Sequence, residues 1–298
     1  MKGLDVNVAN LVKAYRLGKI EVQALRGLNM EVRAGEFVAI IGPSGSGKTT
    51  LLNILGGLDA ATAGTVQVGT INLTSMNTSQ LVEYRRETVG HIFQTLNLIP
   101  TLTATENIEL PMIARGVSRG KRKERVQELL GIVGLIDRSN HKPEELSGGE
   151  QQRVAMAAAL ANDAPIVLAD EPTGELDTVN AKIVVDYLLK VNRELNKTVV
   201  MVTHDPSVAR RTDRILRIED GVIKMTAVPT EMAGEEEAVS YVDQLRIRIK
   251  EIDAQTMRLD EDFKSNKISG DEYVEKRQTL KRTRDSLKEE LHRMGVVI

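Results

Sequence analysis

A nine-residue glycine-rich stretch constrains this chain more than any other part of its sequence. It runs from Gly42 to Thr50, follows the apolar run 37–41 and precedes the helix-like run 51–55. Glycines allow the backbone to curl so that successive N–H groups point at phosphate oxygens, and a following helix adds its positive N-terminus. A buried strand, this loop and a helix in that order predict a phosphate-binding loop. A strand-to-helix turn with an exposed lysine is the alternative.

Two side chains of the loop have predicted roles in holding a nucleotide. Lys48 is expected to reach the β- and γ-phosphates, and the hydroxyl of Thr49 is expected to ligate Mg²⁺. The predicted phosphate-binding residues are Gly42, Pro43, Ser44, Gly45, Ser46, Gly47, Lys48, Thr49 and Thr50.

Short apolar runs predict an α/β fold around this loop. Buried strands that alternate with helices are typical of a mostly parallel sheet with helices on both faces. The expected strands are 36–41, 89–93, 165–171 and 198–202, with a closing pair at 213–225, and the expected helices include 78–87 and 178–195.

Two other regions have a different pattern. Alternating apolar and polar residues at 4–11 and 24–33 predict antiparallel strands, with Tyr15 in the loop between them, and 64–74 is expected to form a strand, a turn and another short strand. From 103 to 135 the apolar residues recur at helical spacing, which predicts an inserted helical subdomain over about 95–160. The core domain, over 1–228, is therefore expected to carry an antiparallel β subdomain and a helical subdomain.

The end of the chain is expected to form a separate helical hairpin. Pro229, Gly234 and the acidic run 235–237 are typical of a linker, placed at 229–237. Two heptad stripes over 238–298 predict an antiparallel pair of helices. Two helices alone seldom bury enough apolar surface to be stable, so the pair is expected to pack against its counterpart in a dimer. A solvated, charged spacer is the alternative that the sequence leaves open.

A second motif lies at Leu146–Arg153, before a predicted helix. Ser147 followed by Glu150 fits a capping box, which commonly begins a helix. A capping box does not need Gly148 and Gly149, whose backbone freedom suits close approach to a phosphate. The motif resembles the signature of ATP-binding-cassette (ABC) ATPases. The resemblance implies that Ser147, Gly148, Gly149 and Glu150 contact ATP held by the opposite subunit of a head-to-tail dimer.

Other motifs of that family follow in the family's order. Asp170 ends the apolar run 166–170 and resembles the carboxylate that helps to hold Mg²⁺, while Glu171 is placed to orient the attacking water. Gln94 resembles a glutamine that touches Mg²⁺ and water, and His204 resembles a histidine that contacts the γ-phosphate. Tyr15 matches the aromatic residue that stacks on adenine, although a core role is the ordinary alternative. The implied catalytic residues are Glu171, His204 and Gln94, and the implied metal ligands are Thr49, Gln94 and Asp170.

Composition limits the ways in which such an ATPase can act. A formal net charge of -2 gives no sign of a nucleic-acid partner, and the absence of cysteine excludes disulfides and thiolate metal sites. The N-terminus lacks the apolar segment of a signal peptide, and no apolar run approaches the ~20 residues of a spanning helix. The chain is therefore expected at the cytoplasmic face of a membrane, with any membrane function supplied by a partner.

Further runs resemble one branch of the family. The stretches 38–59, 93–107 and 168–174 are similar to the ATPases of macrolide exporters, lipoprotein-release complexes and the related cell-division system. The resemblance implies a peripheral ATPase subunit that dimerises and drives membrane permease subunits. A soluble ABC protein in assembly, division or repair is the alternative.

Two positions depart from the family's pattern. Glu175 stands where asparagine or a small residue is usual, and Ala158 stands where arginine is common. An added carboxylate near the dimer seam is expected to slow turnover rather than abolish it, because Lys48, Asp170 and Glu171 are retained.

Overall fold

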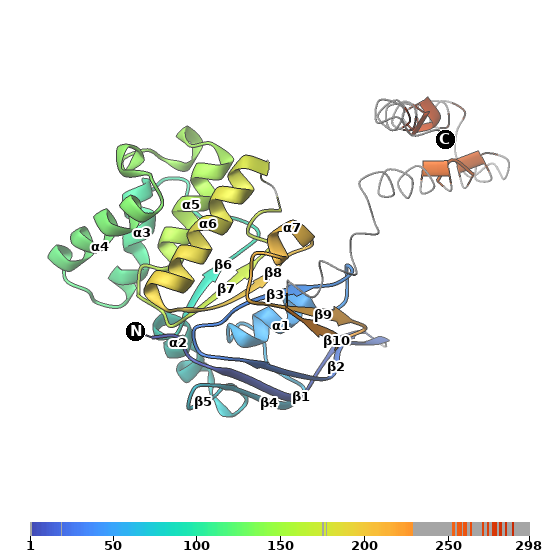
Figure 1. The fold of residues 1–298 in the computed structure, drawn as a ribbon, viewed down its shortest axis with the longest axis horizontal. Coiled ribbons are helices and arrows are strands. Elements are labelled where there is room, and N and C mark those ends of the chain that lie inside the picture. Colours follow the sequence, from blue (N-terminus) through green and yellow to red (C-terminus); the bar gives the residue numbers. More distant parts are fainter. Residues whose placement is uncertain are drawn as a thin grey trace. The chain divides into compact units, whose positions relative to one another are not determined.

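The chain divides into two units, Met1–Thr230 and Glu231–Ile298, and the first contains both sheets (Figure 1). This computed structural model describes residues 2–18, 20–174, 176 and 178–228, together with scattered helical positions from 252 to 288. Among these residues, no helix is both long enough and apolar enough to cross a membrane.

A six-stranded sheet in the order β10-β9-β3-β8-β7-β6 forms the centre of the first unit. All neighbours pair in parallel except β10 and β9, and every residue of β7 and β8 is buried. Burial on both faces explains why these strands read as continuous apolar runs. The predicted mostly parallel sheet is confirmed. Its strands are β3 (Phe37–Ile41), β6 (Val89–Ile92), β7 (Ile166–Asp170), β8 (Thr198–Val202), β9 (Arg214–Glu219) and β10 (Val222–Ala227).

Helices occupy the connections between these strands (Figure 1). Capping boxes begin α2, from Asn77, and α3, from Thr103, so local hydrogen bonds define where both helices start. The helical spacing at 103–135 corresponds to α3 and α4, and α3 packs on α5. The helices are α1 (Lys48–Leu55), α2 (Thr78–Glu87), α3 (Ala104–Ala114), α4 (Arg119–Ile132), α5 (Gly148–Ala159), α6 (Thr178–Leu195) and α7 (Pro206–Ala209), with 3-10 turns at Leu73–Ser75, Ile136–Arg138 and Pro143–Glu145.

A four-stranded antiparallel sheet in the order β2-β1-β4-β5 packs on α1, which also packs on the six-stranded sheet. Apolar residues of β1, β2 and β4 share one core with α1 and with the central strands of the parallel sheet. The strands are β1 (Val6–Leu17), β2 (Ile20–Val32), β4 (Ala63–Val68) and β5 (Ile71–Asn72).

The predicted loop around Tyr15 is wrong. Tyr15 lies within β1 and pairs with Val22, and the β1–β2 hairpin continues to Leu17 and Ile20. Register shifts after Val8 and after Lys13 interrupt the alternation of side chains. Backbone hydrogen bonds between the two strands hold this outer part of the hairpin together without an apolar face. Its sequence therefore lacks the alternating pattern that would have predicted a strand.

Backbone contacts join the two sheets beside the glycine-rich loop. The carbonyl oxygen of Ala24 on β2 lies 2.6 Å from where a Cβ on Gly47 would stand, and 2.6 Å from one on Gly221. The Gly221 amide donates to the Ser46 carbonyl at 3.2 Å, and the Arg26 amide donates to the Gly221 carbonyl at 3.0 Å. Glycine at 47 and 221 therefore permits β2, the loop and the β9–β10 turn to meet.

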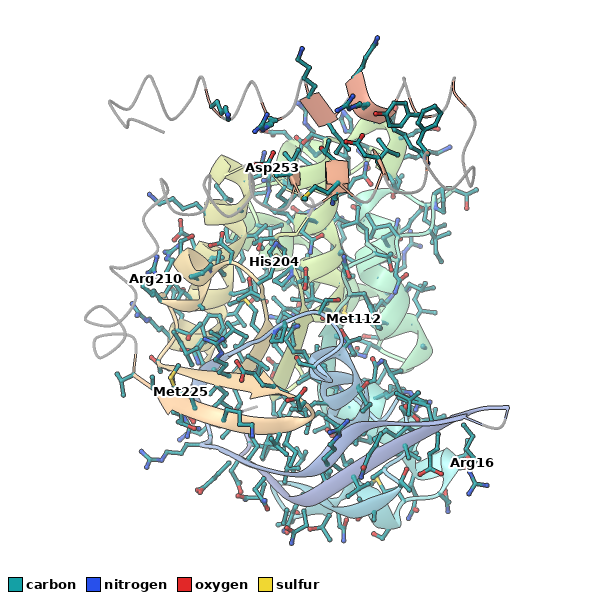
Figure 2. All side chains as sticks on the ribbon, turned by 90° about the vertical axis from the view of Figure 1, so that its right-hand side faces the viewer. Arg16, Met112, His204, Arg210, Met225 and Asp253 are labelled. Carbon is teal, nitrogen blue, oxygen red and sulfur yellow. The ribbon has the colours of Figure 1, made fainter. Side chains whose placement is uncertain are left out.

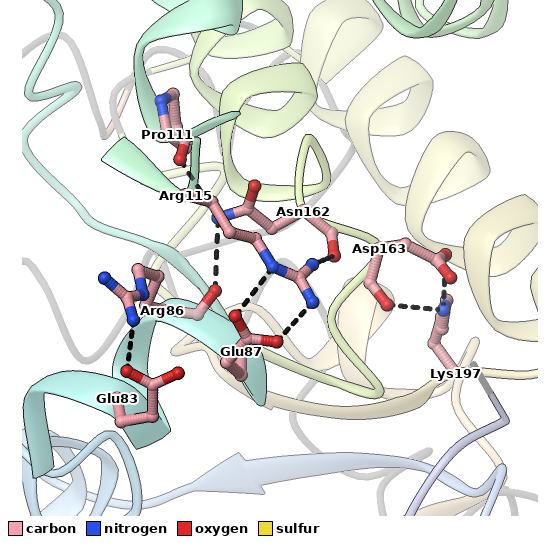
Figure 3. Close-up of polar contacts among 8 residues, drawn as sticks. All are labelled: Glu83, Arg86, Glu87, Pro111, Arg115, Asn162, Asp163 and Lys197. Carbon is pink, nitrogen blue, oxygen red and sulfur yellow. Dashed lines mark hydrogen bonds and ion pairs between the residues drawn. The ribbon is translucent and has the colours of Figure 1, made fainter. Parts of the chain in front are cut away.

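A polar network lies where β6, β7 and β8 begin (Figure 3). Arg115, just after α3, makes a bidentate ion pair with Glu87, in which Nε is 2.7 Å from Oε1, and donates to the Asn162 carbonyl at 3.0 Å. Asn162 donates to the carbonyls of Arg86 at 3.1 Å and Pro111 at 3.3 Å. These bonds tie the ends of α2 and α3 to the turn after α5.

The network continues to β8 through one buried lysine. Lys197 is 1% exposed, and its Nζ lies 2.7 Å from Oδ1 of Asp163 and 3.1 Å from the Asp163 carbonyl. A buried ammonium requires such partners, because desolvation disfavours its charge. Residues preceding three parallel strands are thus joined at the amino edge of the sheet.

The predicted linker, 229–237, and most of the predicted hairpin lie outside the described residues. The described positions are helical, and Arg284 Nε lies 2.8 Å from Asp253 Oδ1, while Arg277 Nε lies 3.4 Å from Asp260 Oδ1. The rings of Phe263 and Tyr273 stack at 4.3 Å. As the residue number increases from 253 to 263 in one segment, the number of the contacting residue decreases from 284 to 273 in the other. This is the pattern of antiparallel helices. The complete hairpin stays a prediction.

The Glu87–Arg115 pair is expected to stabilise the first unit. Arg115→Met removes charge-assisted hydrogen bonds from a partly buried carboxylate and is expected to lower the free energy of unfolding by about 2 kcal/mol. Arg86→Met is the matched control, since its pair with Glu83 is more exposed and is worth less than about 1 kcal/mol. Urea unfolding followed by circular dichroism measures both, and equal losses would contradict the difference.

Two loop glycines are expected to respond differently to alanine. Gly45 has a φ of 77° with open space around a Cβ, so Gly45→Ala is expected to cost about 1 kcal/mol of backbone strain. Gly47→Ala adds a collision with the backbone of β2 and is expected to cost clearly more. Thermal unfolding of the two nucleotide-free variants makes the comparison. A Gly47→Ala protein as stable as Gly45→Ala would show that the two sheets are not joined through this contact.

Candidate active site

The glycine-rich loop leaves the carboxyl end of β3 and ends at the start of α1. Gly42 has a φ of 153°, and a Cβ there would lie 2.1 Å from the Ile218 carbonyl oxygen. Gly47 occupies the N-cap position of α1 without a side-chain cap, and the first turn contains no acidic residue. The backbone amides at the start of a helix can bind an anion when no side chain caps them, and the helix dipole favours a bound anion.

Two buried polar side chains face the interior of the loop. The ammonium of Lys48, which is 9% exposed, donates to the carbonyls of Gly42 at 2.8 Å and Pro43 at 2.9 Å. The hydroxyl of Ser46 is buried and has no hydrogen-bond partner among the described residues. A buried hydroxyl needs a partner, which a phosphate oxygen at this place can supply.

Oxygen atoms suited to a hard cation lie next to the loop. The Thr49 hydroxyl is 3.4 Å from Oδ1 of Asp170, at the end of β7. Burial raises the pKa of Asp170, and the hydrogen bond from Thr49 acts in the opposite direction. The described residues contain no cluster of three His, Cys, Asp or Glu that could hold a metal unaided. This set fits Mg²⁺, which commonly takes one or two protein ligands and completes its shell with phosphate and water oxygens.

Glu171 and His204 form a pair at the ends of neighbouring strands. Nδ1 of His204, which is labelled in Figure 2, lies 2.8 Å from Oε2 of Glu171. Glu171 has a φ of 45°, a left-handed conformation that is strained for a residue with a Cβ, and its amide donates to the Val202 carbonyl at 3.0 Å. Strained residues of this kind concentrate at functional sites.

One cavity collects most of the predicted residues. Its volume is about 530 Å³, and its lining comes from β2, the loop, the segment after β6, and the ends of β7 and β8. The structure therefore brings Gln94, Glu171 and His204 to the phosphate-binding loop, although they are far apart in the sequence. The lining residues are Ala24, Ser44, Gly45, Ser46, Gly47, Lys48, Thr49, Thr50, Gln94, Glu171 and His204.

The predicted signature residues do not line this cavity. Ser147 caps α5 in a capping box: Oε2 of Glu150 accepts from the Ser147 amide at 2.8 Å and from its hydroxyl at 2.9 Å. These hydrogen bonds, together with Arg138, lower the pKa of Glu150. A Cβ on Gly149 would lie 2.4 Å from Oδ1 of Asn180 on α6, so packing between helices explains this glycine. Around Gly148 there is open space.

Tyr15 lies beside the loop rather than in the cavity lining. Its hydroxyl donates to Oδ2 of Asp59 at 2.8 Å, and the ammonium of Lys13 lies 4.8 Å from its ring centre. No role was predicted for Asp59 or Lys13, since the contacts of Asp59 with Tyr15 and with Lys13 each span more than forty residues. Glu175, the acidic departure from the family's pattern, lies outside the described residues.

A second cavity, of about 510 Å³, lies between α2, β6, α3 and α5. Leu96, Leu98 and Ile99 line it, whereas Ile108 is fully buried in the core. The apolar residues of 96–108 therefore divide into groove residues and core residues. Ala158, the other departure, stands in the wall that α5 contributes.

Comparison with known proteins identifies the family. Residues 25–174 match the family model described as "ABC transporter". The chain is 49% identical over 212 residues to the uncharacterized ABC transporter ATP-binding protein YvrO of Bacillus subtilis, covering 71% of this chain and 92% of that one. It is 44% identical to the macrolide export ATP-binding/permease protein MacB of Brucella melitensis, over 73% of this chain and 34% of MacB.

A solved relative has the same fold. The dimeric structure of the cassette MJ0796 bound to ADP and Pi superimposes with a TM-score of 0.71 at 45% identity, covering 75% of this chain and 98% of that one. MJ0796 comes from Methanocaldococcus jannaschii. The predicted P-loop ABC ATPase fold is confirmed, and the chain belongs to the ABC transporter family as one of its ATP-hydrolysing cassettes.

Proposed function

We propose that this cassette works as a head-to-tail dimer at the cytoplasmic face of a membrane, where ATP binding and hydrolysis drive permease subunits. One observation carries the dimer: Lys48 and Glu171 line the nucleotide cavity, but Ser147 does not. A second copy can bring its Ser147 segment to that cavity. The MJ0796 relative, solved as a dimer, supports this arrangement.

The residues of the cavity divide the chemistry among them. Amides of the phosphate-binding loop and the Lys48 ammonium bind the β- and γ-phosphates. Thr49 and Asp170, with Gln94 nearby, hold Mg²⁺, which when bound neutralises phosphate charge. Glu171 accepts a hydrogen bond from the attacking water and orients it toward the γ-phosphate, and His204 holds the Glu171 carboxylate while its own ring faces the phosphate.

The second cavity is the proposed contact for the permease. Apolar side chains at its rim are exposed, with Val82 at 47% and Leu110 at 41%, which suits an apolar helix face. MacB carries an ATP-binding part and a permease in one chain, which supports a membrane partner for this cassette. The relatives named as transporter ATP-binding proteins support the membrane role over a soluble assembly or repair factor.

Glu171→Gln is expected to trap the dimer. The amide keeps the size of the side chain but cannot accept the water's proton, so ATP stays bound and hydrolysis falls at least about a hundredfold. On a chain ending at residue 228, in which the predicted hairpin cannot associate, size-exclusion chromatography with light scattering in Mg-ATP should show a dimer that the same chain without E171Q does not accumulate. Adding Ser147→Arg, at the proposed seam, should restore the monomer while nucleotide still binds. An E171Q protein that binds ATP as a monomer would contradict the shared site.

Ala155→Arg is expected to block the groove without affecting the nucleotide cavity. The longer side chain fills space that a permease helix would occupy, whereas Gln127→Arg adds the same charge on an exposed part of α4. Tagged chains purified from detergent-solubilised membranes of the native host should retain an integral membrane protein with wild type and Q127R but not with A155R. Equal retention by A155R, at equal basal ATPase activity, would place the contact elsewhere.

A further inference from the structure

The phenol of Tyr15 is held by Asp59, which follows α1, and by Lys13 on its own strand. Its hydroxyl donates to Oδ2 of Asp59 at 2.8 Å. Burial raises the pKa of Tyr15 and the side chain of Thr50, in the first turn of α1, acts against it, so Thr50 lies beside the phenol. The Lys13 ammonium lies over the ring, 4.8 Å from its centre. A side chain bound at its tip and on one face has lost most of its rotational freedom.

Asp59 is itself fixed as an acceptor. Its Oδ1 accepts from Lys13 at 2.5 Å and from the Ala60 amide at 2.7 Å, and Lys13 also donates to the Ala60 carbonyl at 2.7 Å. The Lys13 side chain is only 12% exposed. Burial opposes ionisation of Asp59, but the hydrogen bonds from Lys13 and Tyr15 outweigh it and hold the pKa below its usual value. Asp59 is therefore a carboxylate at neutral pH and accepts from the phenol.

This arrangement determines which part of Tyr15 a ligand can reach. Lys13 covers one face of the ring, and Tyr15 is 36% exposed. Thr50, which lies beside the phenol, comes two residues after Lys48, so the ring stands next to the loop that binds phosphates. A base can then stack only on the ring face opposite Lys13, at a fixed position relative to the phosphates of the same nucleotide.

We infer that Asp59 and Lys13 are positioning residues for the nucleobase: they hold Tyr15 as a stacking platform at a fixed place beside the phosphate-binding loop. The inference rests on the stacking role that the family resemblance implies for Tyr15 at the proposed nucleotide site. Under this inference, tight ATP binding needs the hydroxyl of Tyr15 as well as its ring, because only the hydroxyl's bond to Asp59 fixes the orientation of the ring. Phenylalanine at position 15 is therefore not equivalent to tyrosine.

The test compares ATP with tripolyphosphate, which has the phosphates but no base. Asp59→Asn is expected to weaken Mg-ATP binding to the full-length chain about five- to tenfold, the effect of one hydrogen bond, and to leave tripolyphosphate binding unchanged. The KM for ATP should rise more than kcat falls. Tyr15→Phe should match it, and the double variant should be no worse than either single variant, because both remove the same contact. Asp137→Asn, exposed in the 3-10 turn Ile136–Arg138, is the control.

Other outcomes overturn the inference in distinguishable ways. If Asp59→Asn weakens ATP and tripolyphosphate equally, Asp59 supports the phosphate-binding loop and not the base. If Asp59→Asn and Tyr15→Phe both bind ATP like the wild type, neither positions the base. If Tyr15→Ala also binds ATP normally, the proposed stacking role itself fails. Should Asp59→Asn not fold, Lys13→Met takes its place with the same expectations.

Discussion

The phosphate-binding loop must turn in the space between two carbonyl oxygens that belong to other elements. The Ile218 carbonyl of β9 restricts Gly42, and the Ala24 carbonyl of β2 restricts Gly47. No Cβ fits at either position, so this backbone path requires glycine. Because β2 belongs to the antiparallel sheet and β9 to the parallel one, the same constraint that shapes the loop also determines how closely the two sheets approach. The position of α1 depends on both.

Parallel strands then distribute the remaining chemistry. Gln94 follows β6, Asp170 and Glu171 end β7, and His204 follows β8, so these residues reach one edge of the sheet although the chain separates them widely. Ligands bind at this carboxyl edge in open α/β sheets in general. The opposite edge carries the network of Glu87, Arg115, Asn162, Asp163 and Lys197.

Local signals made much of this predictable. Fully buried strands appear as continuous apolar runs, and the glycine-rich loop carries its own backbone requirement, so the parallel sheet and the phosphate-binding loop could be read from the sequence. Tyr15 was misplaced in a loop because interstrand hydrogen bonds leave no apolar pattern. Contacts such as Tyr15 with Asp59 and Gly149 with Asn180 join distant segments, and only the folded chain shows them. Glycine at 149 was predicted to suit close approach to a phosphate, whereas the close approach within the described chain is that of Asn180.

The groove beside α3 has walls of two kinds. On one side, Arg86, Pro111 and Asn162 line it and also supply the carbonyls and the amide that hold the amino edge of the sheet together. On the other side, α5 presents Ala155, Ala158 and Ala159, whose methyl groups make no polar bonds. Substitution of Asn162 therefore changes both the shape of the groove and the stability of the fold. The alanine wall can vary in size and charge at little cost to folding, and selection for a new partner can act there first.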